Sequence, residues 1–167
     1  MNTSSVPHDP LSAARRHWDH RGWSEATPGM AALTSVVRTG HVLRARVDAA
    51  LEPFALTFAR YEVLALLMFS SARALPMSKV SSRLQVQPAS MTHTVRRLEK
   101  DGLLTRLPNP RDGRGTLIGI TDEGIALVNA ATPQLNRVFL DLGLDTEQAE
   151  LLISLCGTVL DHQPREG

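Results

Sequence analysis

The segment Leu75–Gly124, LPMSKVSSRLQVQPASMTHTVRRLEKDGLLTRLPNPRDGRGTLIGITDEG, contains the clearest structural signals of this chain. It begins with two helical segments that a tight connection at Gln85 and Val86 separates. Ser78 is predicted to cap the first helix, which ends near Leu84. Two helices joined by so few residues, the second with a polar outer face, predict a helix-turn-helix.

The second helix of this segment is predicted to run from Pro88 to about Lys100. Proline suits the first turn because its missing N–H group would be unpaired there in any case. Gly102 supplies the left-handed residue that ends the helix. The apolar residues recur at helical spacing, so one face is expected to pack on a small core. The predicted core residues are Met91, Val95 and Leu98 on this helix, with Val80, Leu84 and Val86 beneath it.

A β-hairpin with a basic tip is predicted after the two helices. Residues 103–107 and 116–120 are the expected strands, and PNPRDGRG between them is too rich in proline and glycine for the interior of a helix or strand. A helix-turn-helix followed by such a hairpin is a winged helix. Thr121 is then expected to cap another helix, with Asp122 and Glu123 in its first turn, where the helix dipole favours acids.

Further helices are predicted on the N-terminal side of this unit. Apolar residues at three-four spacing predict a helix from about Gly29 to Leu51, which Pro53 ends. Thr57 is expected to cap the next helix, from Phe58 to about Ser70. The residues SSARALP that follow are predicted to form a loop.

The C-terminal side is predicted to end in a helix as well. Asp145 and Gln148 form a capping-box pattern for a last helix that runs to about Leu160. This helix and the helix over residues 29–51 present more apolar surface than one small winged helix can cover. A homodimer is therefore expected, since two-fold symmetry is the commonest way to cover such surfaces.

These elements predict a fold that is mostly α with a small β-hairpin, a winged helix-turn-helix flanked by N- and C-terminal dimerisation helices. Residues 1–28 are expected to form an N-terminal arm with a short helix from Leu11 to Trp18. The dimerisation helices occupy residues 29–54 and 122–167. The winged helix-turn-helix occupies residues 55–121.

Composition limits the cellular setting. The 167 residues, 43% of them hydrophobic, suffice for one domain with a packed core. No apolar run approaches the roughly 20 residues that a membrane helix requires, and the N-terminal residues lack the apolar core of a secretory signal. The one cysteine excludes an intramolecular disulfide and is typical of a reducing compartment. We therefore expect a cytoplasmic protein.

Charge is distributed unevenly along the chain. Between Met77 and Thr121 there are eight basic and three acidic residues, while the rest of the chain carries a net negative charge. Such a concentration is expected of a module that binds a polyanion, and it is equally compatible with a solvated basic face. Charge alone leaves these two interpretations open.

From about Gly29 to Leu160 the sequence resembles the MarR family of bacterial transcription regulators. Four features carry the resemblance: the helix-turn-helix, LEKDGLLTR, the wing motif around Asp112-Gly113-Arg114, and the IT-x-x-G that opens the next helix. Gly113 stands where arginine is common in that family. The resemblance implies a homodimer in which the N- and C-terminal dimerisation helices of the two subunits interlock. It also implies that this dimer binds a pseudo-palindromic DNA operator and responds to a small-molecule or redox signal. We therefore expect a DNA-binding transcriptional regulator, a ligand-responsive repressor.

The alternative is a winged helix that mediates protein interaction or dimerisation without sequence-specific DNA binding. Such a module needs no basic wing, so the local charge favours DNA. The sequence shows no Gly-rich phosphate loop, no Ser-His-Asp arrangement and no cofactor fingerprint, so neither an enzyme nor a cofactor is expected. A recognition helix presents polar side chains to base edges and phosphates. The predicted DNA-binding residues of this helix are Gln87, Ser90, Met91, Thr92, His93, Arg96 and Arg97.

The wing is predicted to supply three more DNA-binding residues. Arg114 is expected at its tip, where it can enter an A·T-rich minor groove of high negative potential. Asp112 can hold the Arg114 guanidinium or the turn, and Arg111 is expected to contact phosphate.

The resemblance also implies an effector crevice between the dimerisation helices and the DNA-binding lobe. An aromatic or phenolic acid is the expected effector, and the HWDHRGW arm is expected to act as a lid or dimer brace, because a tryptophan needs a packing partner. Cys156 is predicted to be a buried, inert thiol. His17 and His20 have no second cluster to complete a metal site. The predicted pocket residues are Trp18, His41, Phe58, Tyr61 and Glu62.

Overall fold

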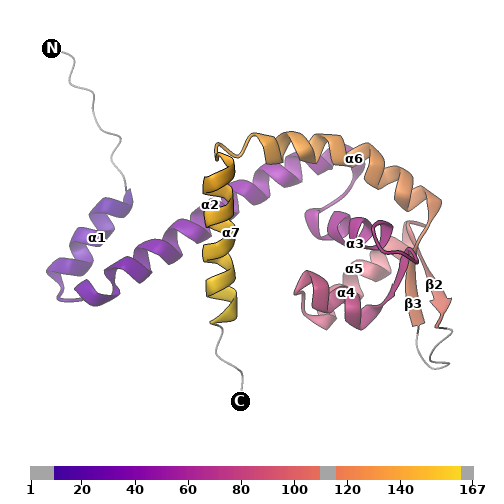
Figure 1. Ribbon diagram of the computed structural model, residues 1–167, viewed down its shortest axis with the longest axis horizontal. Helices are drawn as coiled ribbons and strands as arrows, with labels where there is room; N and C mark the ends of the chain where they lie inside the picture. Colours follow the sequence, from indigo (N-terminus) through magenta and orange to yellow (C-terminus); the bar gives the residue numbers. More distant parts are fainter. Residues whose placement is uncertain (1–9, 110–115, 163–167) are drawn as a thin grey trace, which may run out of the picture. The chain divides into compact units, whose positions relative to one another are not determined.

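The computed structural model describes residues 10–109 and 116–162 of the chain (Figure 1). The chain divides into two compact units, residues 1–47 and residues 48–167. Helix α2 (Thr27–Leu51) begins in the first unit and ends in the second. Most described residues are helical, and three short strands form one antiparallel sheet, which confirms the predicted fold class.

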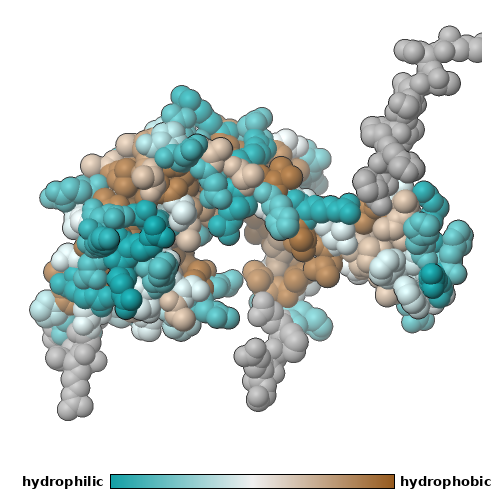
Figure 2. Space-filling model, turned by 180° about the vertical axis from the view of Figure 1, so that it is seen from behind, coloured by the Kyte–Doolittle hydropathy of each residue, from teal (hydrophilic) through white to brown (hydrophobic). Residues whose placement is uncertain are grey.

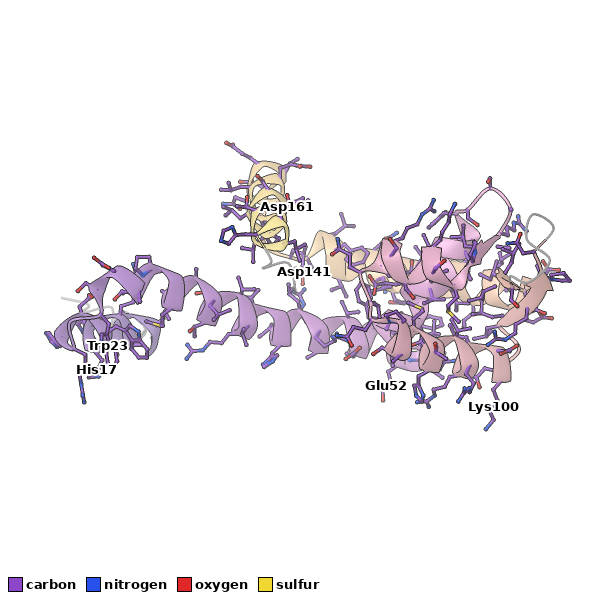
Figure 3. All side chains as sticks on the ribbon, turned by 90° about the horizontal axis from the view of Figure 1, so that it is seen from below. His17, Trp23, Glu52, Lys100, Asp141 and Asp161 are labelled. Carbon is purple, nitrogen blue, oxygen red and sulfur yellow. The ribbon has the colours of Figure 1, made fainter. Side chains whose placement is uncertain are left out.

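The first unit contains a short helix α1 (Pro10–His20), a single 3-10 turn η1 (Ser24–Ala26) and most of α2. The short helix predicted in the arm is therefore confirmed. The rings of Trp18 and Trp23 meet edge to face, with centroids 5.5 Å apart, in the segment that Figure 3 marks with Trp23. The buried hydroxyl of Thr27 donates to Asp19 Oδ1 at 2.7 Å. Trp23 is thus the packing partner of Trp18 within this unit.

The second unit is built around a winged helix. Helices α3 (Phe58–Met68), α4 (Met77–Leu84) and α5 (Pro88–Lys100) lie beside the strands β2 (Leu104–Pro108) and β3 (Thr116–Ile120), as Figure 1 shows. The helix-turn-helix and the hairpin were both predicted. Gln85 adopts the left-handed conformation between α4 and α5, and Gly102 does so after α5.

The sheet contains one strand that was not predicted from the sequence. Residues Ala74–Pro76 form β1, which pairs antiparallel with β3 in the register Ala74↔Gly119. The strand order is β1-β3-β2, so β3 lies in the middle. The prediction of a loop over SSARALP is therefore wrong at its C-terminal end. There the distant strand β3 supplies the hydrogen bonds that hold the segment extended.

The core of the second unit lies between α3, α5, the sheet and the helix α6 (Asp122–Leu140). Tyr61 on α3 is buried, and its hydroxyl lies 2.9 Å from Thr132 Oγ1 on α6. Because Thr132 donates its own hydroxyl hydrogen to Val128 O, Tyr61 is the donor of the pair. The largest fully buried side chains of this core include Leu64, Leu67, Met91, Leu98, Ile118 and Leu135.

Most helix starts have the predicted caps. Thr57 Oγ1 accepts from the backbone of Arg60, and Thr121 Oγ1 accepts from the backbone of Gly124. Asp145 and Gln148 form a complete capping box at α7 (Thr146–Asp161). Ser78 does not cap α4, which contradicts the prediction. The chain passes directly from β1 into α4, so the helix begins at Met77 without a side-chain cap.

Gly124 occupies a position that admits no side chain. A Cβ atom there would lie 2.5 Å from the carbonyl oxygen of Leu103 and 2.7 Å from Cγ1 of Ile120. The Leu103 oxygen cannot retreat freely, because it accepts a hydrogen bond from the backbone N–H of Thr121 at 3.1 Å. The start of α6 is therefore pressed against the beginning of the wing.

Helix α7 has no buried residue, although most of its side chains are apolar. Figure 2 shows hydrophobic residues at its surface. Cys156 is exposed, which contradicts the prediction of a buried thiol, because α7 does not enter the core of its own chain. The large apolar side chains that α7 exposes are Leu151, Leu152, Ile153, Leu155, Val159 and Leu160.

Candidate nucleic-acid interface

Helix α5 has one apolar face in the core and one polar face in solvent. Val95 and Leu98 are fully buried, so the residues between them point away from the core. Figure 3 marks the C-terminal end of this helix with Lys100, which is also exposed. The predicted DNA-binding residues that the structure places on the exposed face are Gln87, Ser90, Thr92, His93, Arg96 and Arg97.

Met91, a predicted DNA-binding residue, does not lie on the exposed face of α5. Its side chain is only 2% exposed and belongs to the core beneath the helix. A thioether held there cannot reach a base edge, so Met91 supports the position of α5 and does not contact DNA itself.

The polar side chains of α5 and of its N-cap differ in which hydrogen-bonding groups remain available to contact a nucleic acid. Thr92 donates to Pro88 O at 2.8 Å and Thr94 donates to Ser90 O at 3.1 Å. Their hydroxyl hydrogens are therefore used within the helix, and their remaining lone pairs suit the N–H donors of adenine or cytosine. Gln87 makes no capping bond to the helix, so its amide can both donate and accept.

An ion pair ties α5 to the wing. Arg106 Nε on β2 lies 3.1 Å from both carboxylate oxygens of Glu99 on α5. Both side chains are partly exposed, so the pair contributes only about 0.2–1 kcal/mol to stability. Both residues are included in the net basic charge of this segment, but their pairing was not predicted from the sequence.

A second ion pair ties α5 to α3. Arg60 donates to Asp101, the residue that ends α5, and to the carbonyl oxygen of Ala55 at 2.9 Å. Ala55 ends the short 3-10 helix η2 (Glu52–Phe54), which follows α2 directly. Arg60 therefore links the end of α2 to the end of the exposed helix α5. Nothing in the local sequence indicated this role, because Arg60 and Asp101 are far apart in the chain.

A cleft of about 420 Å³ opens beside this link, within the second unit. It is lined by residues from the end of α2, from η2, from α3 and from the exposed helix α5. His93 and Arg97 belong both to this cleft and to the predicted DNA-binding face. The lining residues are Asp48, Glu52, Ala55, Leu56, Thr57, Arg60, His93, Thr94 and Arg97.

The predicted wing residues Arg111, Asp112 and Arg114 lie outside the described residues. The two strands that carry them are described, and their last pair is Pro108 with Thr116. The assignment of these three residues to DNA therefore stays a prediction.

The five predicted pocket residues are divided between the two units. Trp18 and His41 belong to the first unit, and Phe58, Tyr61 and Glu62 lie on α3 in the second. The pocket stays a prediction. Among the described residues, no three His, Cys, Asp or Glu side chains gather as a metal site would require. None of the described helices combines the length and the hydrophobicity of a membrane span.

Comparison with known proteins identifies the family. Residues 56–116 match the model of the MarR family. Sco5413, a MarR family transcriptional regulator from Streptomyces coelicolor, is 44% identical, with a TM-score of 0.70 over 82% of this chain and 99% of its own. Sco3205, a MarR family regulator from the same organism whose crystal structure is a complex with DNA, is 26% identical, with a TM-score of 0.71 over 81% of this chain and 88% of its own.

A curated relative agrees with this result. The uncharacterised HTH-type transcriptional regulator YhbI from Bacillus subtilis (strain 168) is 34% identical over 117 residues, which are 68% of this chain and 73% of its own length. Together with the winged helix and the polar face of α5, these likenesses confirm the resemblance seen in the sequence. The chain belongs to the MarR family of transcriptional regulators.

Proposed function

We propose that this transcriptional regulator is a homodimeric repressor that binds a pseudo-palindromic operator and leaves it when a small ligand binds. The observation that carries the DNA-binding part is the exposed face of α5, where Gln87, Ser90, His93, Arg96 and Arg97 stand over a buried apolar row. Repression needs no further surface, since a dimer that occupies an operator excludes polymerase from it.

The exposed apolar surface of α7 supports the dimeric part of the proposal. A soluble monomer rarely leaves so many large apolar side chains in water on one helix. A second copy of the chain would cover them, with residues 29–54 and 122–167 as the dimerisation helices. Two recognition helices related by a two-fold axis then match half-sites about 34 Å apart.

The experiment that tests the proposal is a binding titration on DNA. DNA fragments selected by the protein from a random pool would be measured by fluorescence anisotropy, and the protected bases by footprinting. We expect protection of two half-sites related by two-fold symmetry. Protection of one half-site, or equal affinity for all DNA, would favour the alternative of an interaction module.

The wing arginines provide a more specific prediction. Arg114→Ala is expected to weaken operator binding by about 1–3 kcal/mol, because an arginine in a narrow minor groove reads its shape and potential. Arg111→Ala is expected to lower the slope of log affinity against log salt by about one, as the loss of one phosphate contact requires. Anisotropy titrations at several salt concentrations measure both effects.

Arg137→Ala is the matched control for the wing variants. Arg137 is an exposed arginine on α6 that bonds to Gln134 within its own helix. Its loss removes the same charge away from the predicted interface and is expected to change affinity and salt slope little. If the wing variants change operator affinity and salt slope as little as Arg137→Ala does, the wing is not part of the DNA interface.

We further propose that the N-terminal arm takes part in the response to an aromatic or phenolic acid. Because the chain has two tryptophans, Trp23→Phe leaves Trp18 as the single reporter. We expect such acids to quench Trp18 fluorescence and to weaken DNA binding over the same concentration range, as a ligand that prefers one of two states must do. Deletion of residues 1–24 is expected to remove the response; an unchanged response and an unchanged dimer would show that the arm is not involved.

A further inference from the structure

The cleft beside α5 carries charges of opposite sign on different elements. Asp48 and Glu52 come from the end of α2 and the start of η2, four residues apart, so they lie on the same side of the helix end. His93 and Arg97, also four residues apart, come from α5. Figure 3 labels Glu52, which marks the acidic side.

Three of these charged side chains have no bonding partner among the described residues. Among the described residues, Asp48, Glu52 and Arg97 make no side-chain hydrogen bond and no ion pair within 4.0 Å. Arg60, by contrast, is engaged by Asp101 and Ala55 O. Two carboxylates and a guanidinium therefore line the same space of about 420 Å³ without forming an ion pair across it.

Opposite charges across one cleft select a ligand by its own charge pattern. An anion would gain from Arg97 but would also meet two carboxylates, and a cation would gain from the carboxylates but meet Arg97 and Arg60. A molecule with both charges, separated by a flexible chain, satisfies both sides at once. The volume lies in the range of small-molecule sites, and Leu56 and Ala55 supply apolar lining for a short aliphatic chain.

We propose that this cleft binds a small linear zwitterion, with its ammonium group at Asp48 and Glu52 and its carboxylate at Arg97 and His93. The proposal rests on the proposed function and deepens it, because His93 and Arg97 are also predicted to contact DNA. A ligand bound there competes with DNA for these two side chains. This mode of release acts where the end of α2 meets α5 and differs from that of an aromatic acid near the arm.

The test uses three probes of similar size and different charge: ε-aminocaproate, caproate and hexylammonium. Calorimetry on the full chain measures their binding, and anisotropy measures their effect on the selected DNA. We expect ε-aminocaproate to bind at least about tenfold more tightly than either singly charged probe, a difference of about 1.4 kcal/mol. We also expect ε-aminocaproate to be the probe that displaces DNA at millimolar concentration.

The double variant Asp48→Asn/Glu52→Gln removes the acidic side of the cleft. It is expected to lose the preference for ε-aminocaproate over caproate and to keep binding DNA. The control Asp122→Asn/Glu123→Gln removes two exposed acids of the same unit from the first turn of α6, away from the cleft. That control is expected to retain the preference.

The outcomes separate this inference from the proposed function. Tight operator binding without any preference among the three probes, or a preference that survives in Asp48→Asn/Glu52→Gln, overturns the zwitterion site and leaves the regulator intact. Failure of the unmodified protein to bind selected DNA overturns the proposed function instead, whatever the calorimetry shows.

Discussion

Two acidic substitutions on α7, Leu155→Asp and Val159→Asp together, are expected to abolish the dimer. The two side chains lie four residues apart on one exposed face of the helix, with 56% and 70% of their surfaces in water. Two carboxylates buried there in a dimer would lack partners, and such charges strongly oppose association. Operator affinity is expected to fall about 10²–10⁴-fold, because a single winged helix loses the effective concentration that its partner provides. Analytical ultracentrifugation and anisotropy measure the two effects.

Ser154→Asp is the control for this experiment. Ser154 is exposed and polar on the same helix, so the variant adds a charge without placing it among the apolar side chains. It is expected to remain dimeric and to bind DNA normally. A Leu155→Asp/Val159→Asp protein that still sediments as a dimer would show that α7 is not part of the dimer interface.

Gly124→Ala is expected to lower the free energy of unfolding by roughly 2–4 kcal/mol, a large effect for one methyl group. The added Cβ would collide with the Leu103 oxygen at 2.5 Å, and that oxygen is held by the Thr121 N–H group. Relief requires the start of α6 to move away from the wing, which breaks the hydrogen bond from the Thr121 N–H group to Leu103 O. Urea unfolding at a fixed protomer concentration measures the change, since dimer stability depends on concentration.

Gly29→Ala distinguishes this collision from the ordinary effect of replacing glycine. Gly29 lies in α2, and a Cβ there would meet nothing within 4 Å. Alanine is the better helix former by up to about 1 kcal/mol, so this variant is expected to be as stable as the unmodified protein or slightly more stable. If Gly124→Ala behaves in the same way, the close approach at the start of α6 does not constrain the fold.

Features whose signals are local in sequence were predictable. The caps at Thr57, Thr121 and Asp145 each depend on a side chain and a backbone group three residues away. The outward residues of α5 follow from the helical period alone, once Val95 and Leu98 are assigned to the core. Met91 was placed on both faces in the sequence analysis, and its burial resolves the conflict.

Features that depend on distant partners were not predictable in this way. Strand β1 has three residues, and its pairing partner Gly119 is remote from Ala74 in sequence. Arg60 and Asp101 are separated by 41 residues, so neither residue signals the other. The cleft with Asp48 and Arg97 is lined by residues of four elements, α2, η2, α3 and α5. Cys156 was assigned to a core because its neighbours are apolar, but a partner chain can also cover an apolar helix.

The central place of β3 in the sheet determines how the lobe can come apart. Its two ladders bind β2 on one side and β1 on the other, and β1 leads directly into α4. A fluctuation that frees β3 must break both ladders, so the hairpin and the anchorage of α4 lose order together as one cooperative foldon. The hairpin and the helix-turn-helix are thus structurally coupled, and melting of one without the other is disfavoured.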